Sequence, residues 1–511
     1  MASHPTNTEG TNEEELDEAM LDPAEAAEEI PTDQDAHMDS DDGGGEEADH
    51  DEPVEEIQLQ NDSVAYFDKH KDSIFSIAQH PIHPEIIATG GGDDVGYIFD
   101  CTPPAQPVLP VSYQTDPQPP EREGLAQLAR LDGHTDSINA IAFTAPQGQY
   151  LLTAGLDGRL RAWQGDSTGR KWQFLAEAQE VEEINWLAPC PNTNYPNTIA
   201  LGASDGSVWV YSINADDVNS PLTIVQAFYL HTGPCTAGAW TPDGKLLATV
   251  SEDASFYVWD VFGDAAAAGL APATGAQSVV GLTADDERFK VEGGLYSIAV
   301  SPNGAFAAVG GAEGHIRIVG LPRLGADASV TSGAKGGGSK SKAGGGKQAG
   351  AAKSAGGGSS AGAGQAGQIL ASLQAQSDSV ETLSFSQPPL TLLASGSVDG
   401  SIALFDTAHR FAVRRHIRHA HEEEAVIKVE FVKRGSGAGT EWLLTSCGND
   451  GVVRRWDTRG GTAAAGQGLT KEWRGHRGGG EGGGVLGFVQ GGGGEAVVTA
   501  GDDGVALVFT A

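Results

Sequence analysis

One unit of short strands and a tight turn recurs along this chain and restricts it to a repeat architecture. The fullest copy spans residues 131–164, where Gly133-His134 precedes alternating apolar residues, Asp157-Gly158 makes a turn and Trp163 ends the last strand. Short period-two runs separated by Gly, Asp and Pro indicate antiparallel strands. An Asp-Gly pair supplies the positive φ angles of a two-residue hairpin. Six residues before the end of each third strand stands an acid, at Asp93, Asp157, Asp205, Asp253, Glu313, Asp399, Asp450 and Asp503.

This unit resembles the repeat of the WD-repeat family. The residues that carry the resemblance are the repeat starts at His70, Gly133-His134, His231, His421 and Gly475-His476, and the repeat ends at Trp259-Asp260 and Trp456-Asp457. Members of that family are β-propellers, whose blades are four-stranded sheets around a central channel. The resemblance implies an all-β fold, an eight-bladed WD-repeat β-propeller over residues 61–511. It also implies that the eight acids are structural, binding the turn backbone and the histidine of the repeat.

The two ends of the repeat region predict how the ring closes. The last repeat stops at Ala511, directly after its third strand, and the run of residues 62–69 is predicted to be a lone strand before the first repeat. We expect this run to supply the missing outer strand of the last blade, because an open sheet edge invites aggregation.

Charge and composition divide the chain further. Residues 1–60 hold 22 Asp or Glu and no Lys or Arg, within a chain of net charge −39. We expect a disordered acidic tail there, because so few apolar residues cannot offset the entropy of ordering. Residues 325–368, rich in Gly, Ser and Lys, are expected to be a flexible insertion. Such a chain should repel nucleic acid and anionic membranes and attract basic proteins.

The residues give no sign of an enzyme. The four cysteines lie far apart, without metal or disulfide spacing, which fits a reducing compartment. The glycine runs near the C-terminus lack the Lys-Ser/Thr of a phosphate-binding loop. No signal peptide or membrane-spanning run is visible, and no nucleophile stands beside a base. We therefore expect no catalysis, no metal and no cofactor, and recognition as the class of function.

A set of acidic residues stands just before, or at the start of, six of the eight innermost strands. In a propeller these positions surround one mouth of the channel, so the carboxylates should create a focused negative field that suits Arg and Lys side chains. An ordinary solvated surface of an acidic protein is the alternative. This set, the carboxylate rim, consists of Asp72, Asp136, Glu182, Glu183, Glu292, Asp378, Glu381, Glu422, Glu423 and Glu424.

Several stretches carry a narrower resemblance. They are Tyr66–Ser73, Gly90–Asp93, Gln179–Ile184, Gly206–Trp209 and Thr499–Phe509, and they are similar to the fungal WD-repeat family of ribosome-assembly chaperones, which is related to angio-associated migratory cell protein. That family also has an acidic N-terminal tail and eight blades. The insertion at 325–368 departs from it.

The narrower resemblance implies a specific function. A member of this family is a dedicated chaperone of the basic large-subunit ribosomal protein L10 (universal protein sixteen), and it delivers this client to cytoplasmic pre-60S particles. The client's basic N-terminal segment, captured from the nascent chain or later, would bind the carboxylate rim, with Asp136, Glu183 and Glu381 as the matching positions. The protein would be a cytoplasmic monomer that binds neither nucleic acid nor membrane. A histone chaperone and a scaffold such as a ubiquitin-ligase adaptor remain alternatives.

Overall fold

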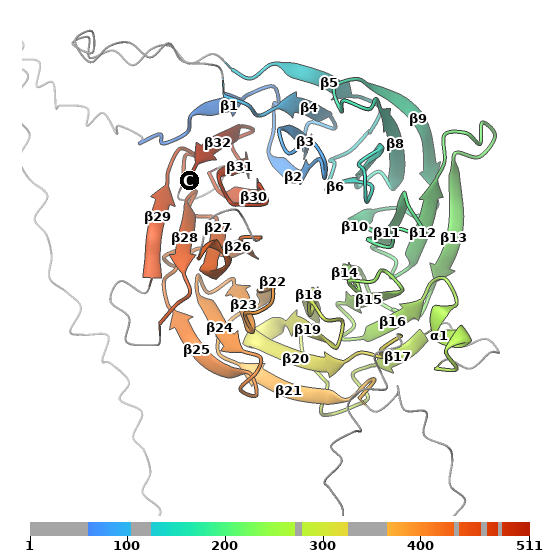
Figure 1. Ribbon diagram of the computed structural model, residues 1–511, viewed down its shortest axis with the longest axis vertical. Coiled ribbons are helices and arrows are strands. Elements are labelled where there is room, and N and C mark those ends of the chain that lie inside the picture. The colour runs from blue at the N-terminus through green and yellow to red at the C-terminus, as the bar shows by residue number, and fades with distance from the viewer. Residues whose placement is uncertain are drawn as a thin grey trace, which may run out of the picture. The chain divides into compact units, whose positions relative to one another are not determined.

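Thirty-two strands form eight four-stranded antiparallel sheets in the computed structural model, which describes residues 60–103, 124–270, 278–324, 365–433, 439–460, 468–478 and 483–511. The sheets are arranged as blades in a ring, with one edge strand of each innermost (Figure 1). This confirms the predicted eight-bladed propeller. The predicted acidic tail (1–60, apart from Gln60) and the predicted insertion (325–368, apart from its last four residues) lie outside the described residues.

Blades are numbered from β2, each with four strands from the channel outward. The innermost strands are β2 (Ile74–Gln79), β6 (Ala140–Phe143), β10 (Ile184–Pro189), β14 (Cys235–Trp240), β18 (Leu295–Val300), β22 (Val380–Phe385), β26 (Val426–Phe431) and β30 (Val485–Gln490). The second strands are β3 (Ile86–Gly91), β7 (Tyr150–Ala154), β11 (Thr198–Ala203), β15 (Leu246–Ser251), β19 (Phe306–Gly311), β23 (Leu392–Ser397), β27 (Leu443–Gly448) and β31 (Ala496–Gly501).

The third strands are β4 (Gly96–Asp100), β8 (Arg159–Gly165), β12 (Val208–Ile213), β16 (Phe256–Asp260), β20 (His315–Gly320), β24 (Ile402–Asp406), β28 (Val453–Asp457) and β32 (Ala506–Thr510). The outermost strands are β5 (Gln127–Leu131), β9 (Trp172–Gln179), β13 (Leu222–Phe228), β17 (Ser278–Leu282), β21 (Ile369–Gln374), β25 (Ala412–Ile417), β29 (Leu469–Trp473) and β1 (Ala65–Phe67). The short helical elements are α1 (Asp264–Ala267), η2 (Ala312–Gly314) and η4 (Thr440–Trp442).

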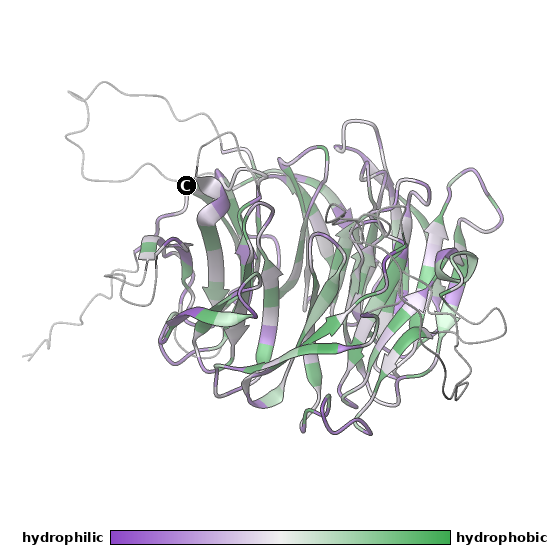
Figure 2. Cartoon of the chain, turned by 60° about the horizontal axis from the view of Figure 1, so that its bottom comes forward, coloured by the Kyte–Doolittle hydropathy of each residue, from purple (hydrophilic) through white to green (hydrophobic). Residues whose placement is uncertain are grey.

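The core lies between neighbouring blades. The second strands are almost entirely buried, because both of their faces are covered by adjacent sheets. One cluster joins Ile86 and Ile98 of blade 1 to Ile141 and Leu151 of blade 2. Figure 2 shows the same division, with hydrophobic residues along the strands and many hydrophilic residues in the loops. Because each blade needs its neighbours to cover its faces, the ring is stable only as a whole.

The ring closes through its first strand. β1 pairs antiparallel with β32, so Ala65 lies opposite Val508 and Phe67 opposite Ala506. This confirms the predicted closure, although the strand is shorter than the predicted run at 62–69. The ring of Phe67 is fully buried and stacks on Phe99 of blade 1, with the two centroids 4.3 Å apart. The first strand therefore completes blade 8 and packs against blade 1.

Candidate functional site

Strand order decides which loops share an end of the ring. Within an antiparallel blade the loops alternate between the two ends. The connection into each innermost strand therefore lies at the same end as the turn between the second and third strands. This end carries both the predicted turn acids and the carboxylate rim.

In four blades the turn acid holds a buried histidine. Histidine Nδ1 lies 2.9–3.0 Å from the carboxylate, and Nε2 lies 2.7–2.9 Å from a hydroxyl of the second strand, in the sets His70–Asp93–Thr89, His134–Asp157–Thr153, His421–Asp450–Ser446 and His476–Asp503–Thr499. The carboxylates of Asp93 and Asp157 also accept the backbone N–H of the residue after the histidine, at 3.0 Å in both cases. These acids are occupied in holding the turns.

The expected pairing with histidine is absent from the other turns. In blade 4, His231 Nδ1 is 4.0 Å from the nearest oxygen of Asp253 and bonds instead to the hydroxyl of Ser255, at 2.5 Å. Blade 6 has Gln376 where the histidine would stand, and blade 3 has the buried Val181. The three turns share another partner for the acid: a serine two residues later donates its N–H and its hydroxyl to the carboxylate, in the pairs Ser207–Asp205, Ser255–Asp253 and Ser401–Asp399.

The eighth turn, in blade 5, departs furthest from the repeat. Glu313 lies within η2 and adopts a left-handed backbone, with φ 54°. This conformation is strained for a glutamate, whereas glycine and asparagine tolerate it better.

Three carboxylates of the rim are held in one geometry. Asp72, Asp136 and Asp378 are exposed, and in each the Oδ1 accepts the N–H of the following serine at 2.7–2.8 Å. This local bond fixes one oxygen and leaves the other available to solvent or a ligand. Because the same bond recurs in blades 1, 2 and 6, these three carboxylates occupy equivalent positions around the channel mouth.

The remaining members of the rim differ in their surroundings. Glu182, Glu183 and the run Glu422–Glu424 are exposed on the loops that enter β10 and β26. Glu292 is less suited to bind a basic ligand, because its carboxylate is paired with Lys290 at 2.9 Å and two glycines separate it from β18.

Glu381 is not in a loop but is the second residue of β22. The ladder to β23 skips it, since Val380 lies opposite Ser397 and Thr382 opposite Gly396. Such a β-bulge redirects a side chain out of the regular pleat. Desolvation by surrounding protein raises the pKa of Glu381, and the charge of Asp378 raises it further. The side chain nevertheless keeps an accessible surface, as expected for a carboxylate inside a crowded, open channel mouth.

Three further acids belong to this end of the ring, although the strand pattern did not predict them. Burial raises the pKa of Asp94, and the next largest cause is the charge of Asp136. Burial raises the pKa of Tyr296 on β18, with the charges of Glu252 and Glu381 adding to the effect. Asp502 accepts the hydroxyl of Ser73 at 2.5 Å. Asp94, Glu252 and Asp502 all stand beside turn acids, which was the signal that could have found them.

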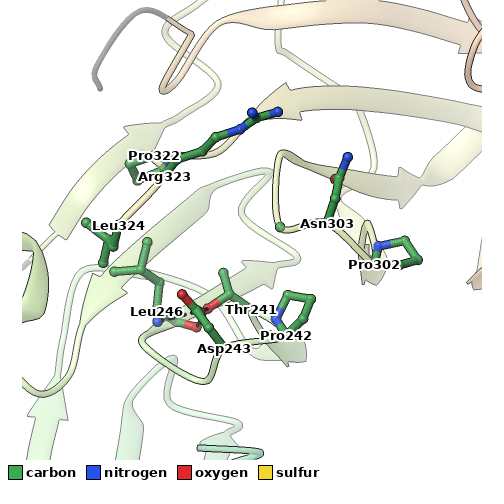
Figure 3. Close-up of a pocket in the computed structure, with 10 residues that line it drawn as sticks. Thr241, Pro242, Asp243, Leu246, Pro302, Asn303, Pro322, Arg323 and Leu324 are labelled. Atoms are coloured by element: carbon green, nitrogen blue, oxygen red, sulfur yellow. Dashed lines mark hydrogen bonds between the residues drawn. The ribbon is translucent and has the colours of Figure 1, made fainter. Parts of the chain in front are cut away.

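One further cavity lies away from the rim. A pocket between blades 4 and 5 lies at the opposite end of the ring, and its two charged side chains, Asp243 and Arg323, come from different loops (Figure 3). Within the described ranges no three His, Cys, Asp or Glu side chains are placed to hold a metal ion. Burial raises the pKa of Cys101 and Cys447 to about 12, so these thiols are unreactive. Among the described helices, none is long and apolar enough to cross a membrane.

Eight four-stranded blades, four of which carry an Asp-His pair at the turn, define a WD-repeat β-propeller. The family model for the WD domain, G-beta repeat, matches residues 125–164, 222–260, 288–319 and 367–406. The chain is 53% identical to Sqt1 of Chaetomium thermophilum, whose crystal structure matches with a TM-score of 0.73 over 88% of this chain and 98% of that one. The chain therefore belongs to the Sqt1 family of WD-repeat proteins, which confirms the resemblance inferred from sequence.

Two other comparisons bear on function. A second crystal structure shows Chaetomium thermophilum Sqt1 bound to the N-terminus of ribosomal protein L10; it is 52% identical, with a TM-score of 0.72, and the match covers 88% of this chain and 100% of that one. The ribosome assembly protein SQT1 of Saccharomyces cerevisiae is 33% identical over 217 residues. That match covers 42% of this chain and less than half of the yeast protein, 44% of its length.

Proposed function

We propose that this protein is a dedicated chaperone of ribosomal protein L10, which captures the basic N-terminal segment of its client on the carboxylate rim. The observation that carries the proposal is the repeated geometry of Asp72, Asp136 and Asp378, three exposed carboxylates fixed alike at one end of the ring. The relative bound to the N-terminus of L10 supports the identity of the client. We assign the contacts to the whole rim, with Asp136, Glu183 and Glu381 as its main members.

The chemistry suits such a client. A ribosomal protein outside the ribosome exposes cations that bind RNA promiscuously, and a ring of carboxylates offers each Arg or Lys a charge-assisted hydrogen bond. The acidic segment 1–60 belongs to the same chain and adds a second weak contact to the client through its effective concentration. Ribosomal RNA presents a stronger anion field, so transfer of the client to the pre-60S particle is downhill. We place this cycle in the cytoplasm, with a monomeric, non-enzymatic chaperone.

Co-purification tests the proposal. The full-length chain, tagged and expressed in a fungal cell, is isolated at low salt and its bound proteins are identified by mass spectrometry. We expect L10 to be enriched and to be lost from the variant Asp136→Lys. Enrichment of histones would favour a histone chaperone, and enrichment of a large complex without L10 would favour a scaffold; either result would contradict the proposal.

A further inference from the structure

The bulge at Glu381 recurs in seven of the eight innermost strands. In each of the seven, the ladder to the second strand skips the second residue. These residues are Phe75, Asn185, Thr236, Tyr296, Glu381, Ile427 and Leu486. In blade 2 the corresponding place, directly after the buried Ile138, is taken by Asn139. Because bulges re-aim side chains next to functional sites, this ring of positions is a candidate contact surface beside the carboxylates.

On one side of the ring these side chains make hydrogen bonds between neighbouring blades. The amides of Asn139 and Asn185 donate to the carbonyls of Ile184 and Cys235, at 3.2 and 3.1 Å. The hydroxyl of Thr236 donates to the carbonyl of Leu295 at 2.7 Å. Each bond links a blade to the first residue of the next innermost strand. Blades 2 to 5 are therefore tied together by this set of residues.

On the other side the residues are apolar. Ile427, Leu486 and Phe75 lie on β26, β30 and β2, which are consecutive innermost strands around the channel (Figure 1). Aliphatic and phenyl side chains carry no donor, so they cannot make the bond that ties blades 2 to 5. Phe75 is 44% exposed, and Leu486 and Ile427 are partly exposed. We call these three residues the apolar arc.

The apolar arc adjoins the carboxylates. A Cβ added to Gly92 would lie 3.0 Å from Cε2 of Phe75 and 3.2 Å from Cγ of Asp72, so the phenyl ring and the carboxylate both border this glycine. Asp72 directly precedes Ser73, whose hydroxyl bonds to Asp502. Glu422–Glu424 stand on the loop that leads to Ile427. The arc is thus an apolar surface edged by negative charge and continuous with the carboxylate rim.

We propose that the apolar arc binds an aromatic or branched aliphatic side chain that lies between basic residues of the client segment. The inference rests on the proposed function and adds what charge alone does not supply, which is selection among basic peptides. Any polycation can bind a ring of carboxylates, whereas an apolar side chain must be placed correctly relative to the flanking cations to reach Phe75. An exposed aromatic side chain such as Phe75 is of a residue class that is enriched in interaction hot spots.

The test compares Phe75→Ser and Leu486→Ser with Ile224→Ser in the full-length protein. Ile224 is also 44% exposed but lies on the outermost strand β13, away from the channel. The probes are a peptide of the L10 N-terminal segment and a second peptide in which every aromatic and aliphatic residue is serine while the charges stay. Affinities are measured by titration calorimetry at low and at raised salt, and unchanged melting confirms that each variant is folded.

We expect Phe75→Ser and Leu486→Ser each to lower the affinity for the first peptide by about tenfold at both salt concentrations, because salt does not screen apolar contacts. The serine peptide should bind the wild type more weakly and be insensitive to both variants. Equal affinity of the first peptide for all variants, or equal loss with Ile224→Ser, would overturn the apolar arc while leaving the proposed function intact. Failure of the wild type to bind either peptide would overturn the proposed function itself.

Discussion

Asp94, in the turn of blade 1, has its pKa raised by burial and, next in size, by the charge of Asp136, which stands on the loop into blade 2. The two residues are brought together by the ring and not by any local element. Like charges gathered in this way raise the free energy of the empty site, and they are relieved when a cation arrives. The free protein is therefore electrostatically prepared for a basic ligand.

Proton release on binding follows from this relationship. The raised pKa values of Asp94 and Glu381 in the free protein should fall when client cations favour the ionised carboxylates. Binding should then release protons at acidic pH, just above the ordinary pKa values of Asp and Glu, and affinity should increase as pH rises through that region. Calorimetry in two buffers of different ionisation enthalpy measures the protons released. An identical heat in both buffers would contradict this expectation.

Charge reversal at the rim should abolish capture without unfolding the ring. We expect Asp136→Lys, Glu183→Lys and Glu381→Lys each to lower the affinity for the L10 segment by about tenfold or more. Each factor of ten corresponds to about 1.4 kcal/mol of binding free energy. The matched control is Asp216→Lys, an exposed carboxylate on a loop at the other end of the ring. Fluorescence anisotropy of a labelled peptide gives the affinities. A loss in the control as large as at the rim would show that net charge, and not the rim, matters.

Loss of the closing strand's main contact should destabilise the whole propeller. Phe67 is fully buried between blades 8 and 1, so Phe67→Ala should cost about 3–5 kcal/mol of unfolding free energy. Denaturant titration measures it, with Val413→Ala, which is 49% exposed on β25, expected within about 0.5 kcal/mol of the wild type. A wild-type midpoint for Phe67→Ala would mean that closure contributes little.

Buried histidine makes stability depend on pH. Burial lowers the pKa of His231 to about 4 from its ordinary 6.5, so the unfolded chain binds a proton there before the folded chain does. The contribution of neutral His231 to the stability of the fold is fully present above pH 6.5. It is lost as the pH falls from 6.5 towards 4. The loss amounts to about 1.4 kcal/mol for each pH unit between these two pKa values.

The variant His231→Gln isolates this contribution. Blade 6 already holds Gln376 at the equivalent position, bonded to Ser401 and Ser395, so the fold accommodates glutamine there. Denaturant titrations of both proteins across this pH range should show a shallower loss of stability for the variant. Parallel curves would indicate that other groups cause the acid sensitivity.

The blades were predictable because their signals are local. The turn acid, the glycine after it and the aromatic end of the third strand lie within seven residues, as in Asp157-Gly158 and Trp163. The closing strand was also predictable, since a last repeat with three strands needs a fourth. In blade 4 Ser255, and not His231, is a close side-chain partner of Asp253. This feature is also local in sequence, because the serine stands two residues after the acid.

The parts of the site that escaped prediction depend on pairing between distant segments. The bulge that re-aims Phe75 and Glu381 exists only relative to β3 and β23, and no pattern within an innermost strand reveals it. Asp94, Glu252 and Asp502 escaped because the rim was sought in only one of the two sets of loops that share that end. The loops into the innermost strands and the turns between the second and third strands are far apart in the sequence of each repeat. They share one end of the ring only because of the order of the strands within each blade.

Titration calorimetry of the full-length protein with the N-terminal segment of L10, as a function of salt, tests the central claim most directly. We predict one peptide per chain, with an affinity that falls steeply between about 0.1 M salt, where the screening length is about 10 Å, and about 1 M, where it is about 3 Å. The decline should be markedly smaller for Asp136→Lys. No binding at low salt, or an affinity that is independent of salt, would contradict capture of a basic client by the carboxylate rim.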